Sequence, residues 1–94
     1  MTEEEFQNIL IIAYFLVEQG KLKNALHVLS LAAEFYTDNI EFNRMLLTIF
    51  YMQKDYKKCA LLFRKHPSLS QGSTLFKQIQ KICQKIGGTN SAGV

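Results

Sequence analysis

The side chains of this sequence that could do covalent or metal chemistry are two histidines, His27 and His66, and two cysteines, Cys59 and Cys83. Neither histidine has a cysteine or a second histidine at the spacing of a metal site, and the cysteines form no CxxC pair. The sequence also contains no glycine-rich phosphate loop, no HExxH motif and no nucleophile elbow. We therefore expect no enzyme, no metal and no cofactor, and we interpret both cysteines as buried thiols.

Three lysines, Lys77, Lys81 and Lys85, recur every four residues and would form a basic face on one helix. Charge is divided unevenly: residues 1–55 hold eight acids and four bases, a net −4, whereas residues 56–94 hold seven bases and no acid, a net +7. A basic half of this kind is typical of a surface for a charged partner, nucleic acid included. Two alternatives stay open, namely a solvated helix face and electrostatic pairing of the two halves within one fold.

The longest apolar stretch, ILIIAYFLV at residues 9–17, follows three consecutive glutamates. A helix that is apolar on every side needs cover on more than one face, either from this chain or from a second molecule. The stretch is too short to cross a bilayer, which takes about 20 apolar residues, and its acidic flank is unlike the basic start of a signal peptide. We therefore expect a cytoplasmic protein without membrane insertion.

Helix signals predict a helical hairpin in the first part of the chain. Thr2 and Glu5 match a capping box, which marks a helix start. Gly20 supplies the left-handed conformation that commonly follows a helix end. Apolar residues at three- and four-residue steps then predict a second helix from Leu22 to Tyr36.

Two more helices are expected before the only proline. Asp38 is a good N-cap, and Glu41 would complete a second capping box for a helix that ends near residue 53. The next helix should span residues 56–65, because Pro67 disfavours helical geometry in the residue before it.

After a polar loop, apolar residues at helical spacing predict a fifth helix at about 73–86. Residues 88–94 contribute no core residue, and we expect a disordered tail there. The sequence therefore predicts an all-α protein with a single domain over residues 1–87.

The two hairpins are similar to each other at an offset of 34 residues. The paired positions are Ile12 with Leu46, Leu16 with Phe50, Leu22 with Tyr56, Ala25 with Cys59, Leu26 with Ala60, and Leu29 with Phe63. In its period and its small residues at helix crossings, the chain resembles the tetratricopeptide repeat (TPR) family, although Ile9 and Asn43 stand where that family favours tryptophan. The resemblance implies two antiparallel TPR-like hairpins, at about 6–37 and 40–66, and a C-terminal capping helix.

In TPR proteins the first helix of each hairpin lines a concave groove. The resemblance therefore implies a partner-binding groove formed by Leu10, Tyr14, Val17, Arg44, Thr48, Tyr51 and Met52. The opposite side of the first helix, Ile9, Ile12, Ala13 and Leu16, is expected to pack on the second helix. An apolar groove suits the apolar face of an amphipathic helix, but the fifth helix could instead fold back and fill it.

With two divergent hairpins, a short length, an apolar groove and the segment LFRKHP, the chain resembles the needle-subunit chaperones of bacterial type III secretion systems. The resemblance implies a binding chaperone that masks an amphipathic helix of the aggregation-prone needle subunit, in a heteromeric complex with a small helical co-chaperone. The alternatives are a general TPR-type protein adaptor and, behind it, a basic nucleic-acid-binding helical domain that uses the lysine face.

Overall fold

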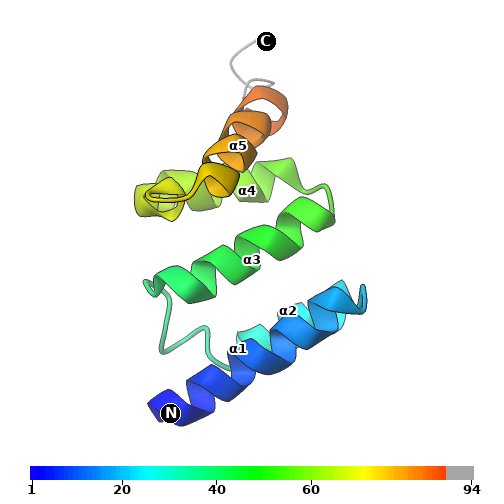
Figure 1. The fold of residues 1–94 in the computed structure, drawn as a ribbon, viewed down its shortest axis with the longest axis vertical. Helices are drawn as coiled ribbons and strands as arrows, with labels where there is room; N and C mark the ends of the chain where they lie inside the picture. Colours follow the sequence, from blue (N-terminus) through cyan, green and yellow to red (C-terminus); the bar gives the residue numbers. More distant parts are fainter. Residues whose placement is uncertain (89–94) are drawn as a thin grey trace. The chain divides into compact units, whose positions relative to one another are not determined.

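The computed structural model describes residues 1–88, and these residues contain helices and turns but no strand. The elements follow in the order α1 Glu3–Glu18, α2 Leu22–Ser30, α3 Ile40–Met52, α4 Tyr56–Lys65, η1 Pro67–Ser70, α5 Thr74–Cys83 and η2 Gln84–Gly88 (Figure 1). The predicted all-α class with five α-helices is confirmed. The expected disordered tail at 88–94 lies, apart from its first residue, outside the described residues.

Helix α1 begins and ends where the sequence predicted, at the Thr2 capping box and just before Gly20. The Glu5 backbone N–H donates to Thr2 Oγ1 at 3.1 Å, and the Thr2 N–H donates to Glu5 Oε1 at 2.9 Å, which completes the predicted capping box. Beyond the helix, Gly20 has a φ of 77°, a conformation in which any side chain would be strained. The chain turns back here, and α2 packs along α1 (Figure 1).

The second helix is shorter than predicted, because α2 ends at Ser30. Past this point the backbone donors move to the carbonyl three residues back, with Leu31 N to Val28 O at 3.1 Å and Ala33 N to Ser30 O at 3.3 Å. The Ser30 hydroxyl also donates to the carbonyl of His27, a local side-chain bond that competes with regular helix. A series of turns therefore replaces the last part of the predicted helix.

The start of α3 lies one residue later than predicted. Asn39 Oδ1, not the carboxylate of Asp38, accepts the N-capping bond, from Phe42 N at 2.9 Å. One turn on, the buried amide Nδ2 of Asn43 donates to Thr37 O at 2.8 Å and to the carbonyl of Asn39 at 2.9 Å. These bonds tie the α2–α3 connection to the first turn of α3.

The fourth helix matches its prediction. Asp55 caps α4 by accepting from Lys58 N at 3.3 Å. The helix ends at Lys65, and His66 leaves the helical region with φ −131° and ψ 76°, as expected for a residue that precedes Pro67.

The segment predicted as a polar loop contains the 3-10 turn η1, in which Leu69 is fully buried. Ser73 then caps α5, its Oγ accepting from Phe76 N at 3.1 Å. Ile79 and Cys83 are buried on this helix, and the wider turn η2 follows it.

The chain groups into two compact units, Met1–Ile49 and Phe50–Val94, and the boundary falls within α3. In the second unit, α4 contacts η1, α5 and η2. The core cluster of the first unit consists of Phe6, Leu10, Ala13, Val17, Ala25, Leu29, Ala32, Phe42 and Ile49. The single domain over 1–87 and the TPR-like pairing of the two hairpins stay predictions.

Candidate functional site

The inward face of α1 agrees only in part with the predicted one: Ala13 is buried and Ile9 and Leu16 pack against the core as expected, but further residues share this face. Phe6, Leu10, Ala13 and Val17 lie at three- and four-residue steps and belong to the core cluster of the first unit. Leu10 and Val17 were expected to face a partner groove, but each is only 8% exposed. Their assignment to an open groove is therefore wrong, because the core of their own unit covers them.

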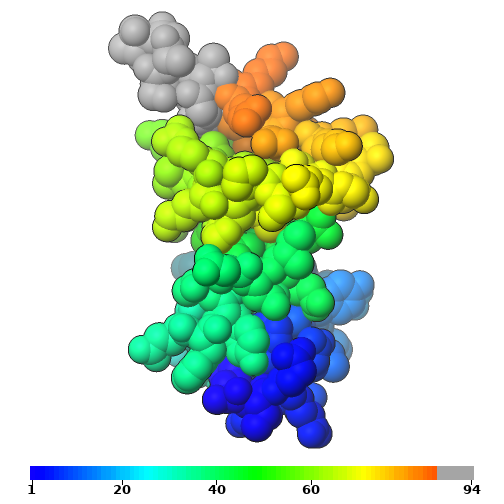
Figure 2. Space-filling model, turned by 90° about the vertical axis from the view of Figure 1, so that its left-hand side faces the viewer, coloured from blue at the N-terminus to red at the C-terminus, as the bar shows by residue number. Residues whose placement is uncertain are grey.

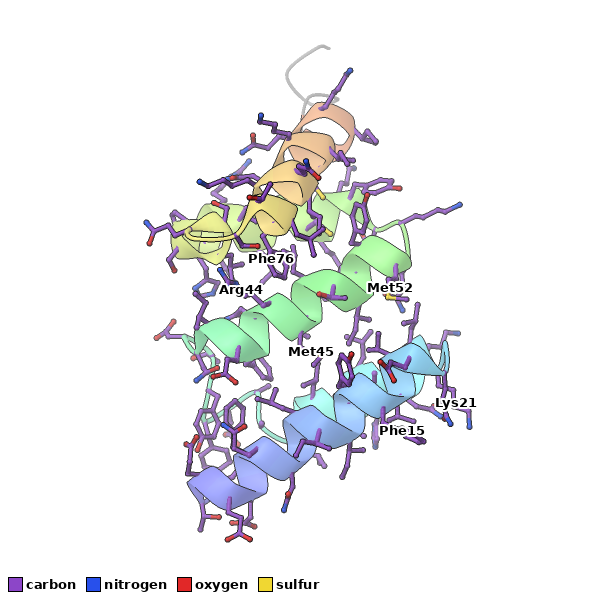
Figure 3. All side chains as sticks on the ribbon, viewed as in Figure 1. Phe15, Lys21, Arg44, Met45, Met52 and Phe76 are labelled. Carbon is purple, nitrogen blue, oxygen red and sulfur yellow. The ribbon has the colours of Figure 1, made fainter. Side chains whose placement is uncertain are left out.

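The opposite side of α1 is apolar and open to solvent. We call it the α1 outer face, defined by Ile11, Ile12, Tyr14 and Phe15, whose exposed fractions are 64%, 49%, 56% and 57%. Ile12 was expected to pack on the second helix, so the structure corrects that orientation as well. Phe15 marks this part of α1 in Figure 3. These four large side chains lie within two helical turns and form a contiguous apolar surface on the first unit.

Tyr14 adds a polar edge to this surface. Its hydroxyl pairs with the carboxylate of Glu18 one turn later, and this hydrogen bond, together with the carboxylate's charge, raises the pKa of the Tyr14 phenol above its ordinary value. The phenol therefore stays protonated and acts as a hydrogen-bond donor beside the apolar side chains.

The rest of the predicted groove comes from both units. Arg44 and Thr48 are half-buried on α3, where Thr48 Oγ1 donates to the Arg44 carbonyl at 2.8 Å. In the second unit, the half-buried Tyr51 ring meets Tyr56 edge-on at 5.9 Å between centroids, and Met52 is exposed. A common groove of Tyr14 and these four residues stays a prediction.

A small apolar pocket lies on the second unit, and sequence reasoning did not find it. It measures about 200 Å³ and is lined by Phe50, Lys58, Leu61, Leu62 and Lys65. The Lys58 ammonium lies 5.3 Å from the centroid of the Phe50 ring and 3.5 Å from Asp55 Oδ2. The spacing of 58, 61, 62 and 65, which places these side chains on one helix side, is the signal that could have revealed it.

The cysteines and histidines, whose side chains could do covalent or metal chemistry, do not come together in a reactive site within the described residues. Cys59 and Cys83 are both buried thiols, as predicted, and they interact across α4 and α5. Burial, followed by the neighbouring Cys83, raises the pKa of the Cys59 thiol to about 12, and burial also raises the pKa of the Cys83 thiol. His27 is exposed on α2, and His66 is half-buried beside the end of α4. Within residues 1–88, no group of three or more acidic, histidine or cysteine side chains could hold a metal ion.

The predicted basic face is exposed in the structure. Lys77, Lys81 and Lys85 all point to solvent along α5 and η2. None of the helices in the described part of the chain has the length and apolar character needed to cross a membrane.

We compared the chain with models of protein families, with curated proteins and with solved structures, and found no match in any of the three comparisons.

Proposed function

We propose that this chain is a non-catalytic binding chaperone that masks the apolar side of an amphipathic client helix. The observation that carries the proposal is the α1 outer face, which leaves four large apolar side chains about half or more exposed on one helix. Contiguous apolar surface of this kind marks sites of protein interaction. The client site is thereby moved from the predicted concave groove to the outer side of the same helix.

Masking works through burial and helix packing. A client helix with apolar residues at three- and four-residue steps would interleave with Ile11, Tyr14 and Phe15 as one helix packs on another. Full burial of such a side chain contributes roughly 1.5 to 3 kcal/mol relative to full exposure. Because these side chains are already partly covered, each contributes less, and several are needed for stable capture.

The identity of the partners rests on the resemblance to the needle-subunit chaperones of type III secretion systems. The proposed client is the amphipathic helix of a secretion needle subunit, and the second partner is a small helical co-chaperone. The complex would act in the cytoplasm and prevent premature polymerisation of the client. A general TPR-type adaptor is the alternative, and it would bind a partner without affecting polymerisation.

The outer face can be tested by co-expressing the needle subunit of the same secretion system with a double variant, Ile11→Asp and Phe15→Asp. We expect capture in a pull-down to fall at least tenfold, because two desolvated carboxylates would oppose the client's apolar side. Leu75→Asp is the matched control, since Leu75 is 63% exposed on α5 and lies outside the site. Undiminished capture by the double variant, with normal far-ultraviolet circular dichroism, would contradict the proposal.

A test of the basic face distinguishes the proposed chaperone from the alternative of a nucleic-acid-binding domain. If Lys77, Lys81 and Lys85 bind a phosphate backbone, the purified protein should retain nucleic acid, and retention should fall steeply with salt. Neutralising the three lysines with glutamine would then remove it while leaving client capture unchanged.

A further inference from the structure

The pocket on α4 combines an apolar floor with a basic rim. Leu61 is 52% exposed, and Phe50 and Leu62 line the pocket beside it. Lys58 and Lys65 are seven residues apart, which places them on the same helix side about 10.5 Å apart along the axis. The pocket therefore fits an apolar side chain that has a carboxylate within about two helical turns.

The surroundings of the pocket favour an acidic occupant. Lys58 forms an exposed ion pair with Asp55, and such pairs contribute little to stability and exchange readily. From residue 56 onward the sequence has seven bases and no acid. A cationic occupant would be repelled, whereas an acidic one would be attracted.

One helix of this same chain has the complementary chemistry. Glu4, Ile11, Phe15 and Glu18 follow one another at steps of seven, four and three residues, so they form one stripe along α1, and all four are exposed. The stripe places two apolar side chains between two carboxylates. Its acidic first turn lies at the surface, in dark blue in Figure 2, and Phe15 is labelled in Figure 3.

We propose that the α1 stripe of one copy of this chain docks on the α4 pocket of a second copy. Ile11 and Phe15 cover Leu61 and Phe50, while Glu18 faces one of the two rim lysines. Phe15 and Glu18 are three residues apart, about 4.5 Å along the helix axis, and so are Leu61 and Lys58 in the pocket, so the apolar and charged contacts form together. This inference goes beyond the proposed function, but it shares Phe15 with it, so a client and a second copy compete for α1.

The proposed contact joins two different surfaces, so a pair of copies leaves the pocket of one copy and the stripe of the other unused. A contact of this type extends into open chains unless the geometry closes a ring. One helix on one pocket is smaller than the roughly 1,000 Å² of a stable interface, so the association is weak and depends on concentration. Salt weakens it further, because the charged rim is exposed and screened.

The contact can be tested by sedimentation equilibrium with two variants, each of which lacks one of the two surfaces. Phe15→Lys removes the stripe but keeps the pocket, and Leu61→Lys removes the pocket but keeps the stripe. The wild type should increase in average mass with concentration, and each variant alone should stay monomeric. Mixed together, the two variants should form a heterodimer and nothing larger, because each supplies the surface that the other lacks. Leu75→Lys, an exposed leucine outside both surfaces, should assemble like the wild type.

Three results would overturn the inference: a wild type that is monomeric up to submillimolar concentration, assembly that survives both single variants, or a mixture that fails to pair. A monomer that instead retains nucleic acid through Lys58 and Lys65 would assign the pocket to phosphate. Leu61→Lys also separates this inference from the proposed function, because it should abolish self-association while client capture persists. Lost capture by Phe15→Lys with intact assembly would contradict the self-association alone.

Discussion

At the scale of single residues, the two cysteines show how burial changes chemistry. Cys59 on α4 and Cys83 on α5 are fully buried beside each other. A thiol reacts as the thiolate, and burial disfavours that charged form, so both groups are expected to be inert at neutral pH. The pair therefore supports the packing of α4 on α5 and has no catalytic role in our proposal.

The raised pKa of the Cys59 thiol predicts a pH-dependent stability. Its ordinary value is 9.0 and its folded value is about 12, so between these values the unfolded chain releases a proton that the folded chain retains. The contribution of this thiol to the free energy of unfolding is complete below pH 9. It falls as the pH rises toward 12, by at most about 1.4 kcal/mol per pH unit. Urea unfolding under reducing conditions should therefore show a steeper alkaline decline for the wild type than for Cys59→Ala. Identical slopes would contradict this account of the thiol.

At the scale of the helical elements, short side chains mark the starts of α1, α3, α4 and α5, whereas α2 has no side-chain cap. Thr2, Asn39, Asp55 and Ser73 each accept a hydrogen bond from a backbone N–H three residues ahead, at the starts of α1, α3, α4 and α5. These donors have no partner within the helix, so a cap stabilises the element that follows it. In the α2–α3 connection, where two adjacent residues could cap, only the geometry distinguishes Asn39 from Asp38.

A pair of alanine variants tests this distinction. Asn39→Ala should lower the free energy of unfolding by about 1 kcal/mol, because the Phe42 N–H loses its acceptor. Asp38→Ala should change it by less than about 0.5 kcal/mol, since Asp38 is exposed and does not cap α3. Urea unfolding followed by circular dichroism measures both. A larger effect of Asp38→Ala would restore the capping box that the sequence predicted.

At the scale of the whole molecule, the two compact units each contain their own buried residues. Leu29 belongs to the core cluster of residues 1–49, whereas Leu69 is buried in residues 50–94. The net charges of the two parts of the sequence also have opposite signs. Because of this charge division, self-association through α1 and α4 should depend on salt. For the same reason an acidic partner should bind the second unit, whereas an amphipathic client helix should bind α1 in the first unit.

Amide hydrogen exchange can show how independent the two units are. Leu29→Ala and Leu69→Ala each leave a cavity that costs about 2 to 5 kcal/mol. We expect Leu29→Ala to speed exchange mainly in α1 and α2, and Leu69→Ala mainly in α4 and α5, because each cavity weakens the packing of its own unit. Equal acceleration along the whole backbone in both variants would instead support the predicted single domain.

The sequence by itself determined the class of fold and most helix ends. The Thr2–Glu5 capping box, the left-handed Gly20 and the stop before Pro67 depend on backbone geometry and on bonds that span only a few residues, so local sequence is enough to predict them. The end of α2 at Ser30 was missed because apolar spacing continues to Tyr36, although the hydrogen bonds there change to turns.

Only the tertiary structure decided which side of α1 faces inward. Residues 9–17 are apolar at every angle around the helix, so no polar position marks the outer side, and the sequence could not separate Leu10 and Val17 from Ile11 and Ile12. Packing against α2 and the rest of the first core chose Phe6, Leu10, Ala13 and Val17. The α4 pocket is a mixed case: helical spacing places its four α4 residues on one side, but only the tertiary structure brings Phe50 of α3 beside Lys58.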